Sequence, residues 1–176
     1  CTASFVNEVP RWREDQELGW VTAEYSMLPA STIPRKPRNK SGRSDGRSVE
    51  IQRLVGRVLR AVVDFKKLGP NTIYLDCDVL QADGGTRTAA INGAYVALMD
   101  AVRYGRKEGH LTEDPLITPV AAVSTGVING RVRLDLDYEL DSNAEVDMNI
   151  AMTGDGRYIE VQGTAEQQPY TTEQLD

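Results

Sequence analysis

Residues 72 to 106 constrain the fold of this chain more than any other segment. Apolar and polar side chains alternate from residue 72 to 80, which is typical of a β-strand with one buried face. Two glycines, Gly84 and Gly85, follow, and an alanine-rich helical pattern then runs from Thr86 to about residue 106. The sequence therefore predicts a strand, a tight turn and a long helix that packs closely against a sheet.

The same turn predicts an anion site. The first turn of a helix exposes unpaired backbone N–H groups and the positive end of the helix dipole. Gly84 and Gly85 would let the backbone approach a ligand, and Thr86 and Arg87 would add a hydroxyl and a guanidinium group suited to phosphate. An ordinary strand–turn–helix junction, with a threonine N-cap and an exposed arginine, is the alternative.

The remaining pattern predicts an α+β fold, with helices packed on a largely antiparallel sheet. Apolar residues recur at helical spacing after Ser48, so we expect a second helix that Ser48 caps and that ends near Lys67. Turns at Asn129-Gly130 and Asp155-Gly156 suggest that the later strands form an antiparallel meander. The expected strands besides 72–80 span residues 20–28, 120–128, 131–138, 144–152 and 158–162.

The composition is that of one ordinary globular domain, since 40% of the residues are apolar and 26% are charged. No apolar run approaches the roughly 18 residues that a membrane-spanning helix needs, so no membrane contact is expected. Cys1 and Cys77 do not suggest a disulfide framework, and we expect a buried thiol at Cys77 and a cytoplasmic location. The single histidine, His110, argues against a Ser-His-Asp triad and against a site of several metal-binding histidines.

Positive charge is concentrated in one segment, although the whole chain carries a net charge of −6. Residues 34–60 carry a net charge of +7, so the rest of the chain carries −13. Such an asymmetry favours a local contact with a polyanion such as RNA, and a solvated loop that binds nothing is the alternative. The basic residues of this segment are Arg35, Lys36, Arg38, Lys40, Arg43, Arg47, Arg53, Arg57 and Arg60.

Two acidic residues, Asp141 and Asp147, form a second candidate site. In the expected strand 144–152, Asp147 and Asn149 lie on the face opposite the apolar residues, and Asp141 lies at the mouth of that strand. Two neighbouring carboxylates would make a hard oxygen site for Mg²⁺ or Mn²⁺, or a coupled acid–base pair, whereas acids exposed on a hairpin are the alternative. Together with the turn and the basic segment, these acids favour phosphoryl or nucleotidyl transfer on a polynucleotide.

Four longer stretches are specific enough to compare with a known family. They are Gly19–Pro29 (GWVTAEYSMLP), Gly46–Arg57 (GRSVEIQRLVGR), Asp76–Thr88 (DCDVLQADGGTRT) and Asp141–Asp147 (DSNAEVD). In order and over nearly the whole chain, the sequence resembles the ribonuclease PH family, phosphate-dependent 3′→5′ exoribonucleases that trim the 3′ ends of tRNA precursors. The stretches separate the chain less sharply from polynucleotide phosphorylase and the exosome ring subunits.

The resemblance implies a fold like the second domain of ribosomal protein S5 and the phosphorolytic activity of a tRNA nucleotidyltransferase. Inorganic phosphate would attack the last phosphodiester of RNA and release a nucleoside 5′-diphosphate. The matching positions imply that Arg47, Thr86 and Arg87 bind phosphate. They also imply that Asp141 and Asp147 serve in catalysis and bind Mg²⁺ or Mn²⁺.

The family also implies a homo-hexamer, arranged as a trimer of dimers, in which the basic loop receives the body of a tRNA from a neighbouring subunit. The loop residues expected to bind RNA are Arg35, Lys36, Arg38 and Arg43.

The chain departs from the family pattern in two ways. Members carry further sequence at both ends, so we expect residues 1–176 to be a single domain truncated at both ends. Ala30 stands where an arginine often follows the Met-Leu-Pro sequence, which would weaken one RNA contact. A non-catalytic RNA-binding ring subunit of an exosome-like assembly is the alternative function, and a fragment that is inactive by itself is another.

Overall fold

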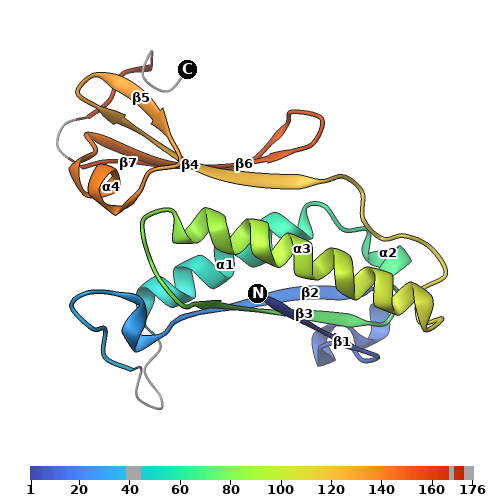
Figure 1. The fold of residues 1–176 in the computed structure, drawn as a ribbon. Helices are drawn as coiled ribbons and strands as arrows, with labels where there is room; N and C mark the ends of the chain where they lie inside the picture. The colour runs from blue at the N-terminus through green and yellow to red at the C-terminus, as the bar shows by residue number, and fades with distance from the viewer. Residues whose placement is uncertain (39–44, 167–168, 173–176) are drawn as a thin grey trace.

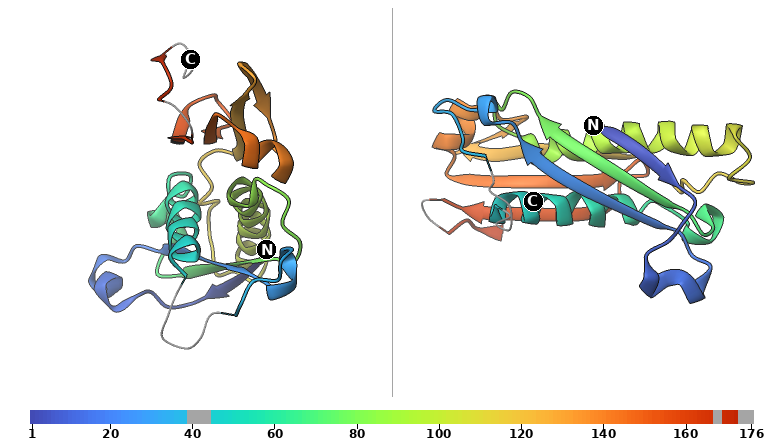
Figure 2. Two further views of the ribbon diagram at one scale, coloured as in Figure 1. Left: turned by 90° about the vertical axis from the view of Figure 1, so that its left-hand side faces the viewer. Right: turned by 90° about the horizontal axis from the view of Figure 1, so that it is seen from below.

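Two β-sheets enclose a layer that contains the two long helices α1 and α3 (Figures 1 and 2). The computed structural model describes residues 1–38, 45–166 and 169–172. The first sheet has the order β1-β3-β2, in which β2 runs parallel to β3 and β1 runs antiparallel to it. Its strands are β1 (Thr2–Val6), β2 (Trp20–Met27) and β3 (Thr72–Val79).

The second sheet is antiparallel throughout and has the order β5-β4-β6-β7. Its strands are β4 (Val120–Ile128), β5 (Arg131–Leu134), β6 (Val146–Thr153) and β7 (Tyr158–Ala165). The helices are α1 (Gly46–Arg60), α2 (Phe65–Leu68), α3 (Thr86–Lys107) and α4 (Tyr138–Asn143), with short 3₁₀ turns at Arg11–Gln16 and Pro29–Ser31. The α+β class is confirmed, but the strands form two sheets rather than one.

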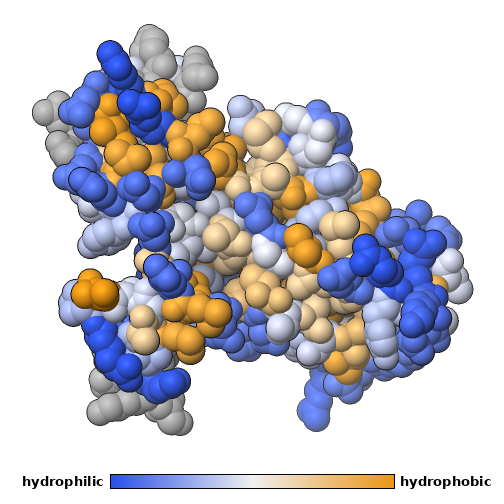
Figure 3. Space-filling view, viewed as in Figure 1, coloured by the Kyte–Doolittle hydropathy of each residue, from blue (hydrophilic) through white to orange (hydrophobic). Residues whose placement is uncertain are grey.

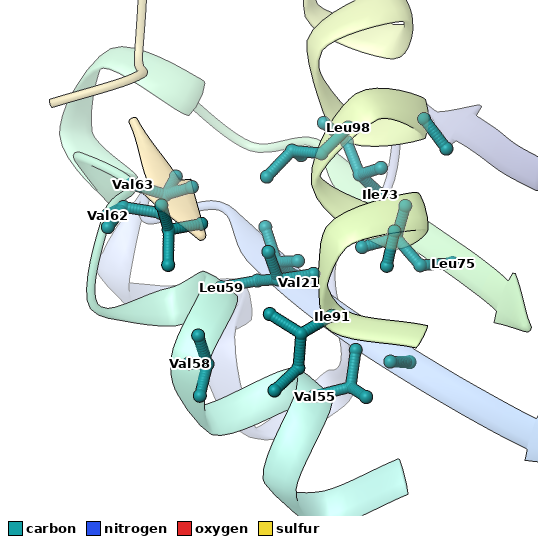
Figure 4. Packing of buried hydrophobic residues seen from close by; sticks show 14 of the residues in the cluster. Val21, Val55, Val58, Leu59, Val62, Val63, Ile73, Leu75, Ile91 and Leu98 are labelled. Atoms are coloured by element: carbon teal, nitrogen blue, oxygen red, sulfur yellow. The ribbon is translucent and has the colours of Figure 1, made fainter. Parts of the chain in front are cut away.

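The apolar stripe of α1 supplies much of the core between the first sheet and α3 (Figure 4). Ile51, Val55 and Leu59 are completely buried, and they belong to one cluster with residues of β2, β3 and α3. Burying each such side chain contributes about 1.5–3 kcal/mol, so the amphipathic spacing of α1 fixes which of its faces meets the sheet. Core residues from the other elements include Val21, Ile73, Leu75, Ile91 and Leu98.

Cys77 is part of this core, as predicted. It is a free cysteine with 3% of its surface exposed, and burial raises the pKa of its thiol to about 11. The alternation along β3 is also confirmed, because Ile73, Leu75 and Cys77 are buried whereas Tyr74 and Asp76 are exposed. No helix in the described residues is both long and apolar enough to cross a membrane.

The predicted bounds of the helix after the basic loop are wrong at both ends. Asp45, not Ser48, is the N-cap of α1, and its carboxylate accepts a hydrogen bond from the backbone N–H of Arg47. The helix stops at Arg60 because the backbone of residues 62–63 pairs with residues 116–117 instead of continuing the helix. Asp64 then caps the separate helix α2.

The predicted meander is wrong at one connection, because its two hairpins form but β5 does not pair with β6. The chain leaves β5 at Leu134, adopts a left-handed conformation at Asp135 (φ 57°) and forms α4, which Asp137 caps. This detour takes the chain across the sheet, so that β6 pairs with the free side of β4 rather than with β5. The predicted strand 131–138 is therefore a short strand followed by a helix.

Asn92 joins α3 to the second sheet. Its side-chain amide donates to the carbonyl of Ala122 (2.9 Å) and accepts from the N–H of Ala122 (2.8 Å). β4 pairs with β5 only from Thr125 onward. On that side of β4, the backbone N–H and C=O of Ala122 therefore bond to Asn92 instead of to a neighbouring strand.

We predict that Asn92→Ala lowers the free energy of unfolding by about 1–3 kcal/mol, because it leaves two backbone groups of β4 without partners. Urea denaturation measures the loss. Val96→Ala, at an exposed position one turn further along α3, is the control and should change stability by less than about 0.5 kcal/mol. Equal effects of the two variants would contradict this role of Asn92.

Candidate active site

The residues predicted to bind phosphate and metal line one cavity. It has a volume of about 340 Å³ and lies where α1 and α3 begin and where β2 and the β3–α3 turn approach the second sheet. Figure 3 shows the molecule hollowed on this side, between the loop that follows β2 and the second sheet. The lining residues include Met27, Lys36, Arg47, Gly84, Gly85, Thr86, Arg87, Ser124, Tyr138, Asp141, Asp147 and Asn149.

The double-glycine turn packs directly against the chain that leads into α4. Gly84 has a φ of 66°, and a Cβ atom there would lie 2.2 Å from the carbonyl oxygen of Leu136. No side chain fits at this contact, and the positive φ also favours glycine. Asp83 adds a bond across the same junction, since its carboxylate accepts from the N–H of Tyr138 (2.9 Å). The turn and the start of α4 are thus held together.

Gly85 is the N-cap of α3, so the alternative of a threonine N-cap is wrong. With φ of 51°, Gly85 takes a left-handed conformation, and no side chain of the described residues caps the helix. The first backbone N–H that bonds back to this turn is that of Ala89, which donates to the carbonyl of Gly85 (3.0 Å). The helix therefore begins without the side-chain acceptor that usually occupies its N-terminus, a position that favours anions.

The hydroxyl proton of Thr86 can be donated to a ligand in the cavity. Its Oγ1 accepts from the hydroxyl of Tyr25 (2.9 Å) and from Nη2 of Arg47 (3.2 Å). A hydroxyl has two lone pairs and one proton, so two accepted bonds leave the proton free to donate. Arg47 forms no ion pair within the described part of the chain, and its charge is available to a ligand in the cavity.

Arg87 is not the exposed arginine of the alternative. Its side chain is 24% exposed, and both Nε (3.1 Å) and Nη2 (2.9 Å) contact the same oxygen, Oε2 of Glu50. Glu50 belongs to α1, one turn after Arg47, so a single turn of α1 meets both Thr86 and Arg87. This places two guanidinium groups at the start of α3.

Asp141 and Asp147 reach the cavity from α4 and β6. Burial raises the pKa of Asp147, the charge of Asp141 raises it further, and Arg87 and Arg47 act in the opposite direction. Asp147 is half-buried, so it is not a solvent-exposed acid of a hairpin. Asp147 thus interacts electrostatically with Asp141 and with both arginines, and all four side chains line the cavity.

The strand β6 is more buried than predicted. The sequence predicted one apolar face and one polar face, but both faces of the strand are covered. Val146 and Met148 pack in a small cluster with Val127. On the opposite face, Asn149 is 9% exposed and Ala151 is 2% exposed and belongs to the main core. The face that carries Asp147 therefore turns toward the interior of the molecule rather than toward solvent.

Asp141 and Asp147 are the carboxylates in this cavity that could bind a divalent cation. No group of three or more His, Cys, Asp and Glu side chains in the described residues could hold a metal ion. The two carboxylates nevertheless fit Mg²⁺, which commonly takes one or two protein carboxylates and completes its shell with substrate phosphate and water. Burial and the charge of Asp141 raise the pKa of Asp147, and a bound divalent cation would favour its ionised form.

The basic loop reaches the same cavity in part. Lys36 lines the cavity and forms an ion pair with Asp45, whereas Arg38 lines an adjoining hollow and Arg35 is exposed. Arg43 lies outside the described residues.

Sequence reasoning missed three residues of the site: Tyr25, Glu50 and Ser124. Tyr25 ends the buried face of β2, where a tyrosine needs a hydrogen-bond partner, and this was a usable signal. Glu50 stands three residues after Arg47 and thus on the same helix face. Ser124, which is 1% exposed and accepts from the N–H of Leu136 (3.1 Å), gave no signal, because its place depends on how the two sheets pack.

Comparison with solved structures gives the fold. Rice (Oryza sativa) Rrp46 matches with a TM-score of 0.73 and 16% identity over 98% of this chain and 71% of its own. The Archaeoglobus fulgidus exosome with RNA bound to the active site matches with a TM-score of 0.73 and 20% identity over 98% of this chain and 69% of the matched chain. These neighbours confirm the expected fold.

Comparison with sequences gives the family. The model of the 3′ exoribonuclease family, domain 1, matches residues 1–103, and that of domain 2 matches residues 118–176. Ribonuclease PH of Corynebacterium kroppenstedtii is 59% identical over 99% of this chain and 69% of its own length. Ribonuclease PH of Bifidobacterium longum is 57% identical over 99% of this chain and 72% of its own length. The chain therefore belongs to the 3′ exoribonuclease family, as a member of its ribonuclease PH type.

Proposed function

We propose that this protein is a phosphate-dependent 3′→5′ exoribonuclease that transfers the terminal nucleotide of RNA to inorganic phosphate. The observation that carries the proposal is the meeting of Arg47, Thr86 and Arg87 with the acids Asp141 and Asp147 around one cavity. The products are a nucleoside 5′-diphosphate and an RNA shortened by one nucleotide. The family name describes a 3′ exoribonuclease, and the cavity contains groups for each part of the proposed reaction.

Phosphate is the attacking group in this reaction. Arg47 and Arg87 offset its negative charge, and the free proton of Thr86 together with the uncapped start of α3 donates to its oxygens. One phosphate oxygen then forms a bond to the phosphorus of the last phosphodiester, and the bond from this phosphorus to the 3′ oxygen of the preceding nucleotide breaks. The same arginines stabilise the charge that develops on the transferring group.

Asp141 and Asp147 act at the leaving side. Their carboxylates would hold Mg²⁺ or Mn²⁺, which supplies Lewis-acid stabilisation of the phosphoryl oxygens when bound. One carboxyl of the pair assists departure of the 3′ oxygen, which must gain a proton to become the new RNA terminus. The half-buried position of Asp147 restricts its exchange with solvent and suits this role.

The tRNA substrate and the assembly are further parts of the proposal. Lys36 at the cavity and Arg38 beside it give the RNA backbone a positively charged path to the site, and we assign Arg35 and Arg43 to the same path. The 3′ ends of tRNA precursors and a homo-hexamer are proposed from the family resemblance, and a cytoplasmic location is proposed from the two free cysteines. A non-catalytic ring subunit is less well supported, because the phosphate-binding groups and both acids are present together.

A first prediction concerns the co-substrate. Short RNA should yield nucleoside 5′-diphosphates only when inorganic phosphate and Mg²⁺ are both supplied, as followed by chromatography of the products. Release of nucleoside 5′-monophosphates without phosphate would contradict the proposal.

Arg87→Ala should raise the KM for phosphate by about 10- to 100-fold, because it removes a charge-assisted hydrogen bond. Arg103→Ala, at the exposed far end of α3, is the control and should not change it.

A second prediction concerns Asp147. Asp147→Asn should lower kcat by about 100-fold or more while RNA binding, measured by fluorescence anisotropy, remains largely intact.

Without divalent cations, the Asp147→Asn variant should also be more stable than the wild type at neutral pH. The folded-state pKa of Asp147 is raised, so the wild type loses stability as the pH rises above 3.8, the ordinary pKa of an aspartate. The difference should vanish below that pH, and Mg²⁺ should reduce it at neutral pH.

Asp155→Asn is the opposite control for the stability measurement. Hydrogen bonds from Thr153 and Arg157 lower the pKa of Asp155, so this carboxylate contributes stability above pH 3.8 that is lost as the pH falls. Thermal unfolding between pH 3 and pH 8 should therefore show effects of opposite sign in the two variants, with a small effect at the exposed Asp155. The same sign in both would contradict the assignment for Asp147.

A third prediction concerns the basic loop. The double change Lys36→Ala and Arg38→Ala should raise the KM for RNA and make RNA binding less dependent on salt, because it removes up to two phosphate contacts. Lys66→Ala with Lys67→Ala, in α2, is the charge-matched control. An unchanged salt dependence in the loop variant would contradict an RNA path along this loop.

A further inference from the structure

Glu50 is held between the two sides of the site. Its Oε2 accepts both Nε and Nη2 of Arg87, at 3.1 Å and 2.9 Å, and its Oε1 accepts from Nε2 of Gln162 at 3.4 Å. These contacts link α1 to α3 on one side and to β7 on the other. Glu50 contacts the phosphate-binding group Arg87 through one oxygen and is itself fixed through the other.

The contact uses only part of the guanidinium group. Arginine carries five N–H bonds in a plane, and the pairing with Glu50 occupies the Nε side. The opposite side, with Nη1, remains free of any recorded partner among the described residues. Arg87 lines the same cavity as Asp141 and Asp147.

We propose that Glu50 is a positioning residue, which fixes the guanidinium group of Arg87 so that its free side meets phosphate. The inference rests on the proposed function. Arg47 and Glu50 lie three residues apart on α1, so they share one face of the helix. One turn of α1 thus provides a phosphate-binding arginine and the carboxylate that orients the other arginine.

Glu50 could act by orienting Arg87 or by its own negative charge. These two roles predict opposite effects on the KM for phosphate when Glu50 is changed. If its negative charge were what mattered, its removal would bring phosphate closer to an unopposed Arg87 and would lower the KM for phosphate. If orientation matters, loss of the acceptor frees the long side chain of Arg87 and raises this KM. Glu50→Gln removes the charge but keeps an acceptor oxygen, whereas Glu50→Ala removes both.

We expect Glu50→Ala to raise the KM for phosphate by roughly 10-fold, because the rotamer freedom of an arginine must then be lost on binding. Glu50→Gln should stay within about 2-fold of the wild type, since its amide oxygen can still accept from Arg87. The KM for RNA should change in neither variant. A lower or unchanged KM for phosphate in Glu50→Ala, or equal losses in both variants, would overturn the proposal.

Glu160→Ala is the matched control. Glu160 on β7 accepts from Nε (2.9 Å) and Nη2 (2.8 Å) of Arg57 on α1, so this pair joins the same two elements as Glu50 and Gln162. It does not touch Arg87, and its loss should leave both KM values unchanged. A rise in the KM for phosphate in this control would show that the effect comes from loosened packing of α1 on β7, and it would also overturn the proposal.

Calorimetric titration with inorganic phosphate separates this inference from the proposed function. If the wild type binds phosphate and Glu50→Ala binds it more weakly, the positioning role stands even if no RNA is degraded, and only the proposed reaction fails. If RNA is degraded with phosphate but Glu50→Ala binds phosphate as well as the wild type, the positioning role fails alone. Thermal unfolding of each variant verifies that it is folded at the temperature of the titration.

Discussion

The close approach of two backbones at the double-glycine turn is the constraint on which the site depends. The carbonyl of Leu136 lies where a Cβ atom of Gly84 would be, so this contact exists only because the side chain is absent. It brings the end of the first sheet against the chain that leaves the second. The start of α3 and the start of α4 therefore face one cavity, and residues more than fifty positions apart meet there. A larger residue at Gly84 would separate the arginines from the acids.

The charges of the cavity are arranged so that an anion and a cation complement each other. Among the described residues, Arg87 pairs with Glu50 and Lys36 with Asp45, whereas Arg47 forms no ion pair and donates to the neutral hydroxyl of Thr86. Burial and the charge of Asp141 raise the pKa of Asp147, so the ionised acidic pair is unfavourable without a cation beside it. A bound phosphate would meet Arg47 and Arg87, and a divalent cation would meet the acids. Each ligand thus removes an imbalance that the protein alone leaves, which suits a reaction that needs both.

Local pattern predicted much of the fold and four residues that line the cavity, Thr86, Arg87, Asp141 and Asp147, whereas Arg47 was assigned from the family resemblance. β4 has the predicted bounds and α3 nearly so, because alternation and helical spacing report directly on burial. Asn129-Gly130 forms the predicted turn between β4 and β5. The N-cap of α1, the separate helix α2 and the order of the second sheet were not predicted, since they depend on competing caps and on pairing between distant segments. Glu50 and Ser124 were missed for the same reason: their partners belong to other elements.

The helix α4 explains how the acidic pair comes together, because it replaces an extended chain at Asp141. In a continuous strand, Asp141 and Asp147 would be about 20 Å apart, because each residue advances by about 3.3 Å. The helix α4 shortens this path, and the chain turns back at Ala144 before β6 begins. Asp137 caps α4, and Asp83 holds the N–H of Tyr138, so the position of Asp141 depends on the double-glycine turn. The spacing of the two acids becomes a site only through this short helix, which the double-glycine turn itself anchors.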